Sequence, residues 1–184
     1  MATAVLALQG AFIEHEHRLA ELGEEVFELR DLPDLSRPFE RLVLPGGEST
    51  VQAKLLRERQ MLQPLKERIE AGMPVLGTCA GAILLARELE GGEPAFASFP
   101  ALVKRNAYGR QLGSFVAQAP FEGLGTVPMT FIRAPYFAEL YDGAEELARV
   151  DGRIVAARSG SQLAVAFHPE LDADTRTHEL FLKL

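Results

Sequence analysis

The chain has 184 residues, of which 47% are hydrophobic and 24% are charged, and its formal net charge is −7 at pH 7. This length suits one domain with a substantial core, so we predict a single domain over residues 1–184. The acidic balance, without a basic stripe, argues against a nucleic-acid partner, and no segment is long and apolar enough to span a membrane. The single cysteine excludes an internal disulfide and fits a reducing compartment, so we expect a cytoplasmic protein.

The first half of the chain alternates short apolar runs with amphipathic segments. The predicted order is a strand at 3–8, a helix closed by Gly23, a strand at 24–29, a loop at 31–39, a strand at 41–44, helical pieces at 48–59 and 61–71, and a strand that ends at Gly77. This alternation is typical of an α/β protein with an open, mostly parallel sheet and helices on both faces. Ligands of such sheets bind beyond the carboxyl ends of the strands.

The second half is rich in glycine, proline and short apolar runs. Strands are predicted at 113–119, 127–132, 146–150, 153–157 and 162–167. Asp151–Gly152 between two of them indicates a hairpin. Asp172 is expected to cap a final helix that runs to Leu184. We therefore predict antiparallel strands added to the parallel core in this half of the chain.

Cys79 lies between an apolar run that ends at Gly77 and a helical apolar run that begins at Ala82. The segment Gly77–Gly81 has the form Gly-x-Cys-x-Gly, the thiol version of a nucleophile elbow, where a sharp strand-to-helix turn lifts the nucleophile above the sheet. Flanking glycines permit the tight turn that such a site needs. The alternative is a lone buried cysteine that acts as a small hydrophobic residue. The elbow alone leaves both interpretations open.

His168–Pro169–Glu170 is the second informative segment. A residue before proline is held in extended conformation, and residues two apart in extended chain face the same way. His168 and Glu170 would then project together, so the carboxylate could orient the imidazole as a general base. Cys79 is the thiol that would complete a Cys-His-Glu triad. The alternative for the tripeptide alone is a turn with two solvated side chains.

Pro45–Gly46–Gly47 ends the strand at 41–44. Glycines at a strand end let backbone N–H groups approach a ligand, and the N–H groups of Gly47 and Ala80 could together form an oxyanion hole. A plain Pro-Gly turn is the alternative. A phosphate-binding loop is disfavoured because its lysine and spacing are missing.

The remaining histidines are predicted to have no role. His15 and His17 are two residues apart, so they lie on different faces of a helix, whereas metal-binding histidines favour i, i+4 spacing. We expect both on a solvated helix face, and we expect His178 to be exposed on the last helix. No metal and no cofactor are predicted.

Several motifs together carry a family resemblance. The segments Leu44–Thr50, Gly77–Gly81 and Phe167–Leu171 resemble the class I glutamine amidotransferase domain. More narrowly, Leu8–Gly10, Arg105–Gln111 and Phe131–Pro135 are similar to the glutaminase subunits of pyridoxal phosphate synthases. The motifs occur in the family's order over essentially the whole chain. The resemblance implies a flavodoxin-like, three-layer fold of the class I glutamine amidotransferase type.

The resemblance also implies an activity and its residues. L-Glutamine would be hydrolysed to L-glutamate and ammonia through a γ-glutamyl thioester on Cys79, with His168 as the proton carrier and Glu170 as its orienting group. By the family match, the residues that contact glutamine would be Gly47, Glu48, Ser49, Arg105, Ile132 and Arg133. An arginine suits the α-carboxylate, and an acid such as Glu48 suits the α-ammonium group.

The family's glutaminases dock on a synthase subunit, which receives the ammonia and builds pyridoxal phosphate (vitamin B6). We therefore expect low activity in isolation and activation on docking. Our hypothesis is that the backbone of Gln9–Gly10 shifts on docking to complete the oxyanion hole.

Two other functions stay open from the sequence. One is another cysteine hydrolase of the same fold, such as a peptidase-like or DJ-1-like protein, although these typically lack the late His-x-Glu and the segment Arg105–Gln111. The other is a non-enzymatic partner module with a degenerate pocket, which is disfavoured because all three triad residues are present.

Overall fold

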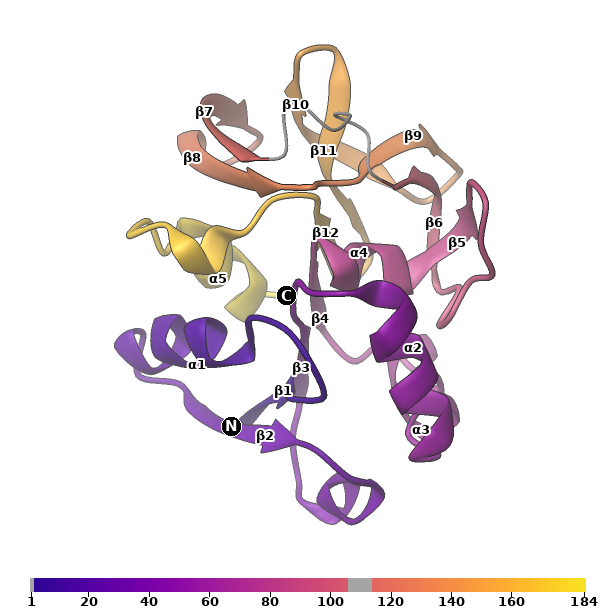
Figure 1. Ribbon diagram of the computed structural model, residues 1–184. Helices are drawn as coiled ribbons and strands as arrows, with labels where there is room; N and C mark the ends of the chain where they lie inside the picture. The colour runs from indigo at the N-terminus through magenta and orange to yellow at the C-terminus, as the bar shows by residue number, and fades with distance from the viewer. Residues whose placement is uncertain (1, 106–113) are drawn as a thin grey trace.

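The computed structural model describes residues 2–105 and 114–184, and within them twelve strands join into one sheet. The first part of the sheet has the order β2-β1-β3-β4-β12, and every pair of neighbours in it is parallel. Its strands are β1 (Ala2–Leu6), β2 (Glu25–Leu29), β3 (Arg41–Leu44), β4 (Val75–Thr78) and β12 (Gln162–Val165). The carboxyl ends of these strands therefore meet along one edge of the sheet (Figure 1).

Helices cover both faces of the parallel part (Figure 1). One face carries α1 (Phe12–Glu21) and α5 (Arg176–Leu182), and the other carries α2 (Ser49–Glu58), α3 (Leu62–Glu70) and α4 (Ala80–Leu85). Side chains alternate along each strand, so Leu42 and Leu44 pack toward α2 and α3 whereas Val43 packs toward α1 and α5. This double burial explains why the inner strands are mostly apolar, whereas the edge strand β2 carries Glu25 and Glu28.

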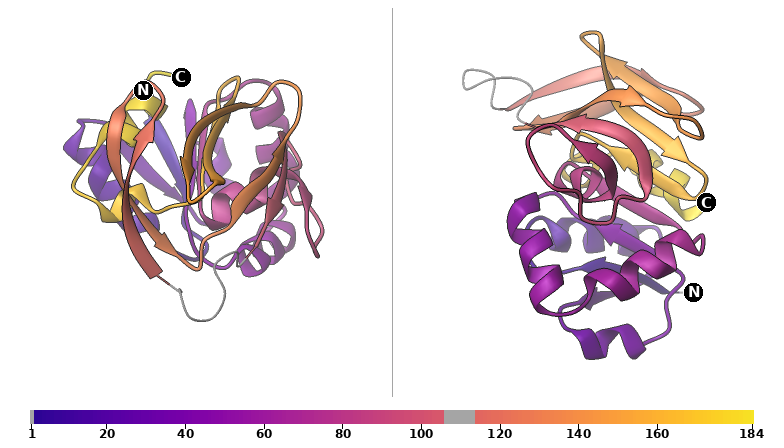
Figure 2. Two further views of the ribbon diagram at one scale, coloured as in Figure 1. Left: turned by 90° about the horizontal axis from the view of Figure 1, so that it is seen from above. Right: turned by 90° about the vertical axis from the view of Figure 1, so that its right-hand side faces the viewer.

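The rest of the sheet is largely antiparallel and lies beyond the helix-covered part (Figure 2). After β12 the order continues through β11, β10, β7 and β8, and β9, β6 and β5 form a side branch. These strands are β5 (Ala86–Leu89), β6 (Phe99–Lys104), β7 (Ser114–Phe121), β8 (Gly125–Ile132), β9 (Tyr136–Leu140), β10 (Glu145–Val150) and β11 (Arg153–Ser159). Two short 3-10 turns, η1 (Leu32–Ser36) and η2 (Pro169–Leu171), complete the described elements.

The fold class predicted from the sequence is confirmed: the sheet is mostly parallel in the first half, with antiparallel strands added from the second. The strand at 41–44 is confirmed to the residue. The Asp151–Gly152 hairpin is also confirmed, since positive φ angles of 49° and 76° at these two residues match the turn that joins twisted strands. Strands β5, β6 and β9 were not predicted. Gly113, the predicted start of one strand, lies outside the described residues.

One predicted cap is wrong. Asp172 ends the turn η2 instead of starting a helix, and its Oδ1 accepts a hydrogen bond from the Thr130 hydroxyl at 2.9 Å. The final helix α5 begins at Arg176, with Thr175 at the N-cap position, and ends at Leu182. Among the helices that the structure describes, none is both long and apolar enough to cross a membrane.

Candidate active site

Cys79 is the single residue between β4 and α4. Its backbone angles, φ 47° and ψ −100°, fall in a region that residues with a side chain rarely occupy, as expected for a strained nucleophile elbow. The Cys79 N–H donates a hydrogen bond to the Val165 carbonyl at 2.8 Å, which ties the elbow to the end of β12. The side chain is 6% exposed. The sequence-predicted elbow is therefore present, and the buried Cys79 lines a cavity.

Gly81 shows why the elbow needs small residues. A Cβ atom at this position would lie 1.9 Å from the backbone carbonyl oxygen of Leu44 at the end of β3. No side chain fits there, since real Cβ contacts are never that short. Glycine thus lets the start of α4 press against the sheet and fixes where the sulfur projects.

The parallel pairing of β4 with β12 brings the proposed base to the nucleophile. Val165 is opposite Thr78 in the register, so the chain leaves both strands at the same edge. The His168 side chain lies beside Cys79 on the wall of one cavity, and its Nδ1 is 2.7 Å from Glu170 Oε1. The structure therefore brings all three predicted triad residues together.

The local reason for this arrangement differs from the one expected. His168 is near-extended, with φ −110° and ψ 82°, but Pro169–Leu171 form the 3-10 turn η2. The turn curls the Glu170 carboxylate back under the imidazole, where it is 2% exposed. The predicted extended conformation of Pro169–Glu170 is therefore wrong, although the predicted contact between His168 and Glu170 is present.

The charges of the three side chains are strongly coupled. Burial lowers the pKa of His168, but its hydrogen bonds with Cys79 and Glu170 outweigh this and raise the pKa to about 10. Burial raises the pKa of Glu170, but the neighbouring His15 and the hydrogen bond with His168 outweigh this and lower it. A buried carboxylate thus holds the imidazole beside Cys79 and favours the protonated form of that ring.

A cavity of ≈ 920 Å³ opens beside Cys79 and His168. It is lined by every residue that the resemblance assigned to glutamine binding, namely Gly47, Glu48, Ser49, Arg105, Ile132 and Arg133, and also by Gln9. The sequence reasoning missed four lining residues, Thr50, Ile83, Glu90 and Ser114. Two of them had a usable signal, since Thr50 is the last residue of the Leu44–Thr50 motif and Ile83 lies one helical turn after Cys79.

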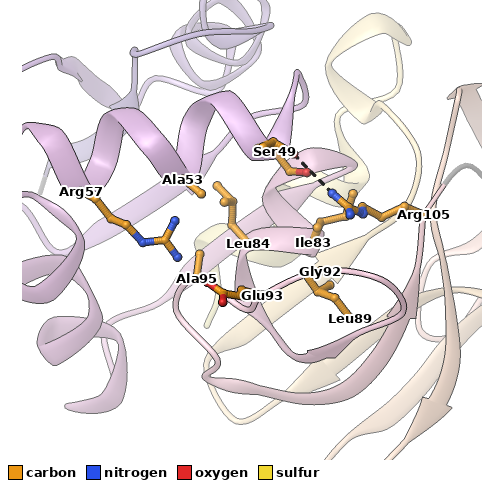
Figure 3. A pocket seen from close by; sticks show the side chains of 11 residues that line it. Ser49, Ala53, Arg57, Ile83, Leu84, Leu89, Gly92, Glu93, Ala95 and Arg105 are labelled. Carbon is orange, nitrogen blue, oxygen red and sulfur yellow. Dashed lines mark hydrogen bonds between the residues drawn. The ribbon is translucent and has the colours of Figure 1, made fainter.

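The two arginines line the cavity from different elements. Arg105 donates to the Thr50 hydroxyl at 3.3 Å and to the Gly91 carbonyl at 2.7 Å. It stands between this cavity and a smaller hollow of ≈ 270 Å³ beside α2 and α4, into which Arg57 also points (Figure 3). Arg133 is exposed and has a positive φ of 46°. The rest of the predicted Arg105–Gln111 segment lies outside the described residues.

Gln9 and Gly10 lie next to the Gly46–Gly47 turn. The Gln9 side-chain oxygen accepts the Glu48 N–H at 2.8 Å, and the Gln9 backbone carbonyl accepts from Gln52 Nε2 at 2.9 Å. Gln52, which the sequence analysis did not single out, is buried and also donates to the Pro45 carbonyl at 3.1 Å. Ala80 is buried as the first residue of α4, directly after Cys79.

Two of the histidines expected on the surface are buried. His15 and His178 are both 0% exposed, so their predicted placement on solvated helix faces is wrong, whereas His17 is exposed as predicted. The reason is tertiary: α1 and α5 pack side by side on the same face of the sheet and bring the two rings together (Figure 1). Across residues 2–105 and 114–184, no group of three histidine, cysteine or acidic side chains could hold a metal ion.

Comparison with known proteins settles the family. A model of the SNO glutamine amidotransferase family matches residues 5–184. The chain belongs to this family. A protein of Desulfitobacterium hafniense (strain Y51), named pyridoxal 5'-phosphate synthase subunit PdxT, is 57% identical over 99% of this chain and 92% of its own length. Proteins of the same name from Methanocorpusculum labreanum and Streptococcus pneumoniae (strain ATCC 700669 / Spain 23F-1) are 53% and 48% identical, each over 100% of this chain and 97% of their own length.

Solved structures agree with the SNO-family assignment. A crystal structure of a glutamine amidotransferase superposes with a TM-score of 0.94 at 45% identity and covers 100% of this chain and 98% of that one. A glutamine amidotransferase of Thermotoga maritima has a TM-score of 0.67 at 19% identity, over 100% of this chain and 83% of that one, and shares the fold. The resemblance read from the sequence motifs is thereby confirmed.

Proposed function

We propose that this SNO-family protein is a glutaminase that hydrolyses L-glutamine to L-glutamate and ammonia and delivers the ammonia to a synthase subunit for pyridoxal phosphate biosynthesis. The observation that carries the proposal is the Cys79–His168–Glu170 series at the edge of a cavity lined by the family's glutamine-binding positions. The family match and the PdxT relatives supply the substrate and the pathway. We further propose that residues 1–184 work as one domain in the cytoplasm, consistent with the single free cysteine.

The proposed reaction begins at the sulfur. The Cys79 thiolate attacks the side-chain amide carbon of glutamine, and the oxygen of the tetrahedral intermediate is stabilised by backbone N–H groups of Gly47 and Ala80. His168, protonated at this stage, gives its proton to the amide nitrogen. The carbon–nitrogen bond then breaks, ammonia leaves, and a γ-glutamyl thioester remains on Cys79.

The second half of the reaction restores the enzyme. His168, now neutral, takes a proton from a water molecule as that water attacks the thioester carbon. The carbon–sulfur bond breaks, L-glutamate leaves and the Cys79 thiolate returns beside a protonated imidazole. Glu170 keeps the ring in one orientation throughout, since its Oε1 contacts the ring nitrogen that faces away from Cys79.

Charged residues on the cavity wall would select the substrate. Glu48 suits the α-ammonium group of glutamine, and Arg105 or Arg133 suits the α-carboxylate. Gly47, Ser49 and Ile132 complete the proposed contacts. The Gln52 contact fixes the Gln9 carbonyl, so the proposed shift of the Gln9–Gly10 backbone on docking would have to break this hydrogen bond.

The assay that tests the proposal is ammonia release from L-glutamine with the synthase subunit present. We expect glutamine-dependent release by the wild type and a loss of at least about 10³-fold in Cys79→Ala, since removing a nucleophile abolishes the covalent route. Ammonia release that does not depend on Cys79, or none at all, would reject the proposal. This result would also separate the glutaminase from other cysteine hydrolases and from a non-enzymatic module.

A further inference from the structure

Behind the triad lies a pair of buried histidines to which the proposed reaction gives no task. His15 Nδ1 is 3.0 Å from His178 Nε2, and the other ring nitrogen of His15, Nε2, is 3.0 Å from the Thr78 hydroxyl and 3.3 Å from Glu170 Oε2. Both rings are 0% exposed. The side chains of Cys79, His168, Glu170, His15 and His178 thus form one continuous series from the cavity into the protein interior.

The contacts favour one arrangement of protons along the series. Glu170 Oε1 is used by His168, while Oε2 has no hydrogen bond of standard geometry among the described residues and faces His15 Nε2. A carboxylate oxygen repels a ring lone pair, so His15 carries its proton on Nε2, where the N–H faces both Glu170 Oε2 and the accepting Thr78 hydroxyl. His15 Nδ1 is then an acceptor, and His178 must donate to it from Nε2.

The far end of the series agrees with this assignment. His178 Nδ1 is buried and has no hydrogen-bond partner in the described part of the chain. With the proton of His178 on Nε2, the atom left unpaired is an acceptor, and buried acceptors are left unpaired more often than buried N–H donors. The opposite assignment would bury an unpaired N–H donor and set a lone pair against Glu170, which costs more.

We propose that His15 and His178 are positioning residues for the glutaminase reaction: His178 fixes the tautomer of His15, and His15 fixes the second oxygen of Glu170, which in turn orients His168. This inference rests on the function proposed above. It assigns no contact with the substrate to either histidine. It extends the triad inward by two uncharged imidazoles.

Burial explains why both rings stay neutral, even though some of the charges around them favour protonation. His15 faces Glu170, whose charge favours protonation, but also His168, and Glu14 is the other nearby acid. His178 is near His15, Glu170 and Arg18. Burial outweighs these charges and lowers the pKa of His15, and it lowers the pKa of His178 to about 3. A neutral donor leaves the full negative charge of Glu170 to stabilise protonated His168, whereas a charged His15 would compete for it.

A purely structural role for the two histidines is the alternative. The helix α1 also contacts η2 through Arg18, which donates to the Glu170 backbone carbonyl at 3.3 Å. A structural pair would affect folding but not the proton affinity of His168. The pH dependence of the reaction distinguishes the two roles. If His15 positions Glu170, its loss weakens the contact of Glu170 with His168 and lowers the pKa of His168. The alkaline limb of the kcat profile then moves to lower pH.

The test compares His15→Leu, His15→Gln and His178→Leu with the wild type, all with the synthase subunit present, from pH 6 to pH 10. We expect kcat to fall by about tenfold or more in the two leucine variants, as for other residues that orient a catalytic group, with KM little changed and the alkaline limb shifted to lower pH. His15→Gln keeps an N–H donor at the Nε2 position and should recover much of the rate. His17→Leu, on the exposed face of the same helix, is the matched control and should match the wild type.

A measurement independent of activity covers variants that fail to fold. Nitrogen-15 NMR of the histidine rings in the full wild-type chain at pH 7 should show His15 and His178 neutral, each with its proton on Nε2. An Nδ1-protonated or doubly protonated His15 would overturn the proposal, as would leucine variants with an unshifted pH profile. A wild type that releases no ammonia would instead reject the proposed function, whatever the ring spectra show.

Discussion

At the scale of single residues, Gly46 controls the position of the base. It lies in the turn after β3, and a Cβ atom there would be 2.3 Å from Cε1 and 2.8 Å from Nδ1 of His168. The imidazole therefore rests directly on the glycine backbone. Its contacts with Cys79 and Glu170 restrict how far the ring can move away from Gly46.

We expect Gly46→Ala to push the imidazole of His168 away from Cys79. A displacement of about 1 Å in a catalytic group costs roughly 10²-fold in rate, so kcat should fall by about that factor while glutamine still binds. Steady-state kinetics with the synthase subunit would measure the loss. Thermal unfolding and circular dichroism serve as controls that the fold persists. An unchanged kcat would show that the ring has room that the structure does not indicate.

The sequence identified those site residues that have characteristic neighbours in the chain. Cys79 has a glycine two residues away on each side. His168 is followed by a proline and then by Glu170. Both residues can therefore be recognised from the sequence alone. His15 and His178 have no such signal, because their burial depends on the packing of α1 against α5 and η2. From the pattern of a single helix, a polar side chain such as histidine is predicted to be exposed to solvent.

At the scale of secondary-structure elements, α2 holds the loop after β1 in place. Gln52 is buried on α2 and bonds the carbonyls of both Gln9 and Pro45, which belong to two different strand-end loops. Because the Gln9 carbonyl is fixed in this way, its peptide cannot turn without losing a hydrogen bond.

We expect Gln52→Leu to lower the cost of the proposed shift at Gln9–Gly10. One buried hydrogen bond contributes about 1 kcal/mol, so the ratio of docked to isolated glutaminase activity should fall by roughly fivefold. The measurement is ammonia release with and without the synthase subunit, with Lys54→Leu on the exposed side of the same helix as the control. An unchanged ratio would mean that the Gln52 contact does not resist activation.

Elements of the second half were harder to predict than those of the first. In the parallel part, strands buried on both faces read as apolar runs, and their alternation with helices fixed the fold class. Strands β5, β6 and β9 form a side branch whose pairing is partly irregular, with register shifts in both β5–β6 and β6–β9. Buried and exposed residues do not alternate regularly along these strands, so the local sequence pattern does not reveal them.

At the scale of the whole molecule, the buried histidines make stability depend on pH. The pKa of His178 is about 3 in the folded protein, against an ordinary value of 6.5. Between these values the unfolded chain binds a proton that the folded protein does not, so stability is fully present above about pH 6.5 and falls as the pH drops toward 3. The lowered pKa of His15 acts in the same direction.

We expect His178 to decrease the free energy of unfolding by up to about 1.4 kcal/mol per pH unit between pH 6 and pH 4. Urea unfolding at several pH values would measure the slope, and His178→Leu should make it shallower even where the variant is less stable at pH 7. An equal slope in both proteins would show that His178 does not titrate as its burial requires. On the alkaline side, His168 acts oppositely: its pKa is raised to about 10, so its contribution is present below pH 6.5 and is lost as the pH rises toward 10.

The central place of β12 has a consequence for the order in which the protein is made. β12 is the last strand in the chain, yet it lies between β4 and β11, and its Val165 carbonyl holds the Cys79 N–H. Until the ribosome has synthesised β12, one edge of β4 has no partner strand. Cys79 then lacks both the Val165 carbonyl that accepts its N–H and the proposed base His168. The nascent chain therefore lacks a complete triad, and its open strand edge is available for pairing with another chain until β12 is added.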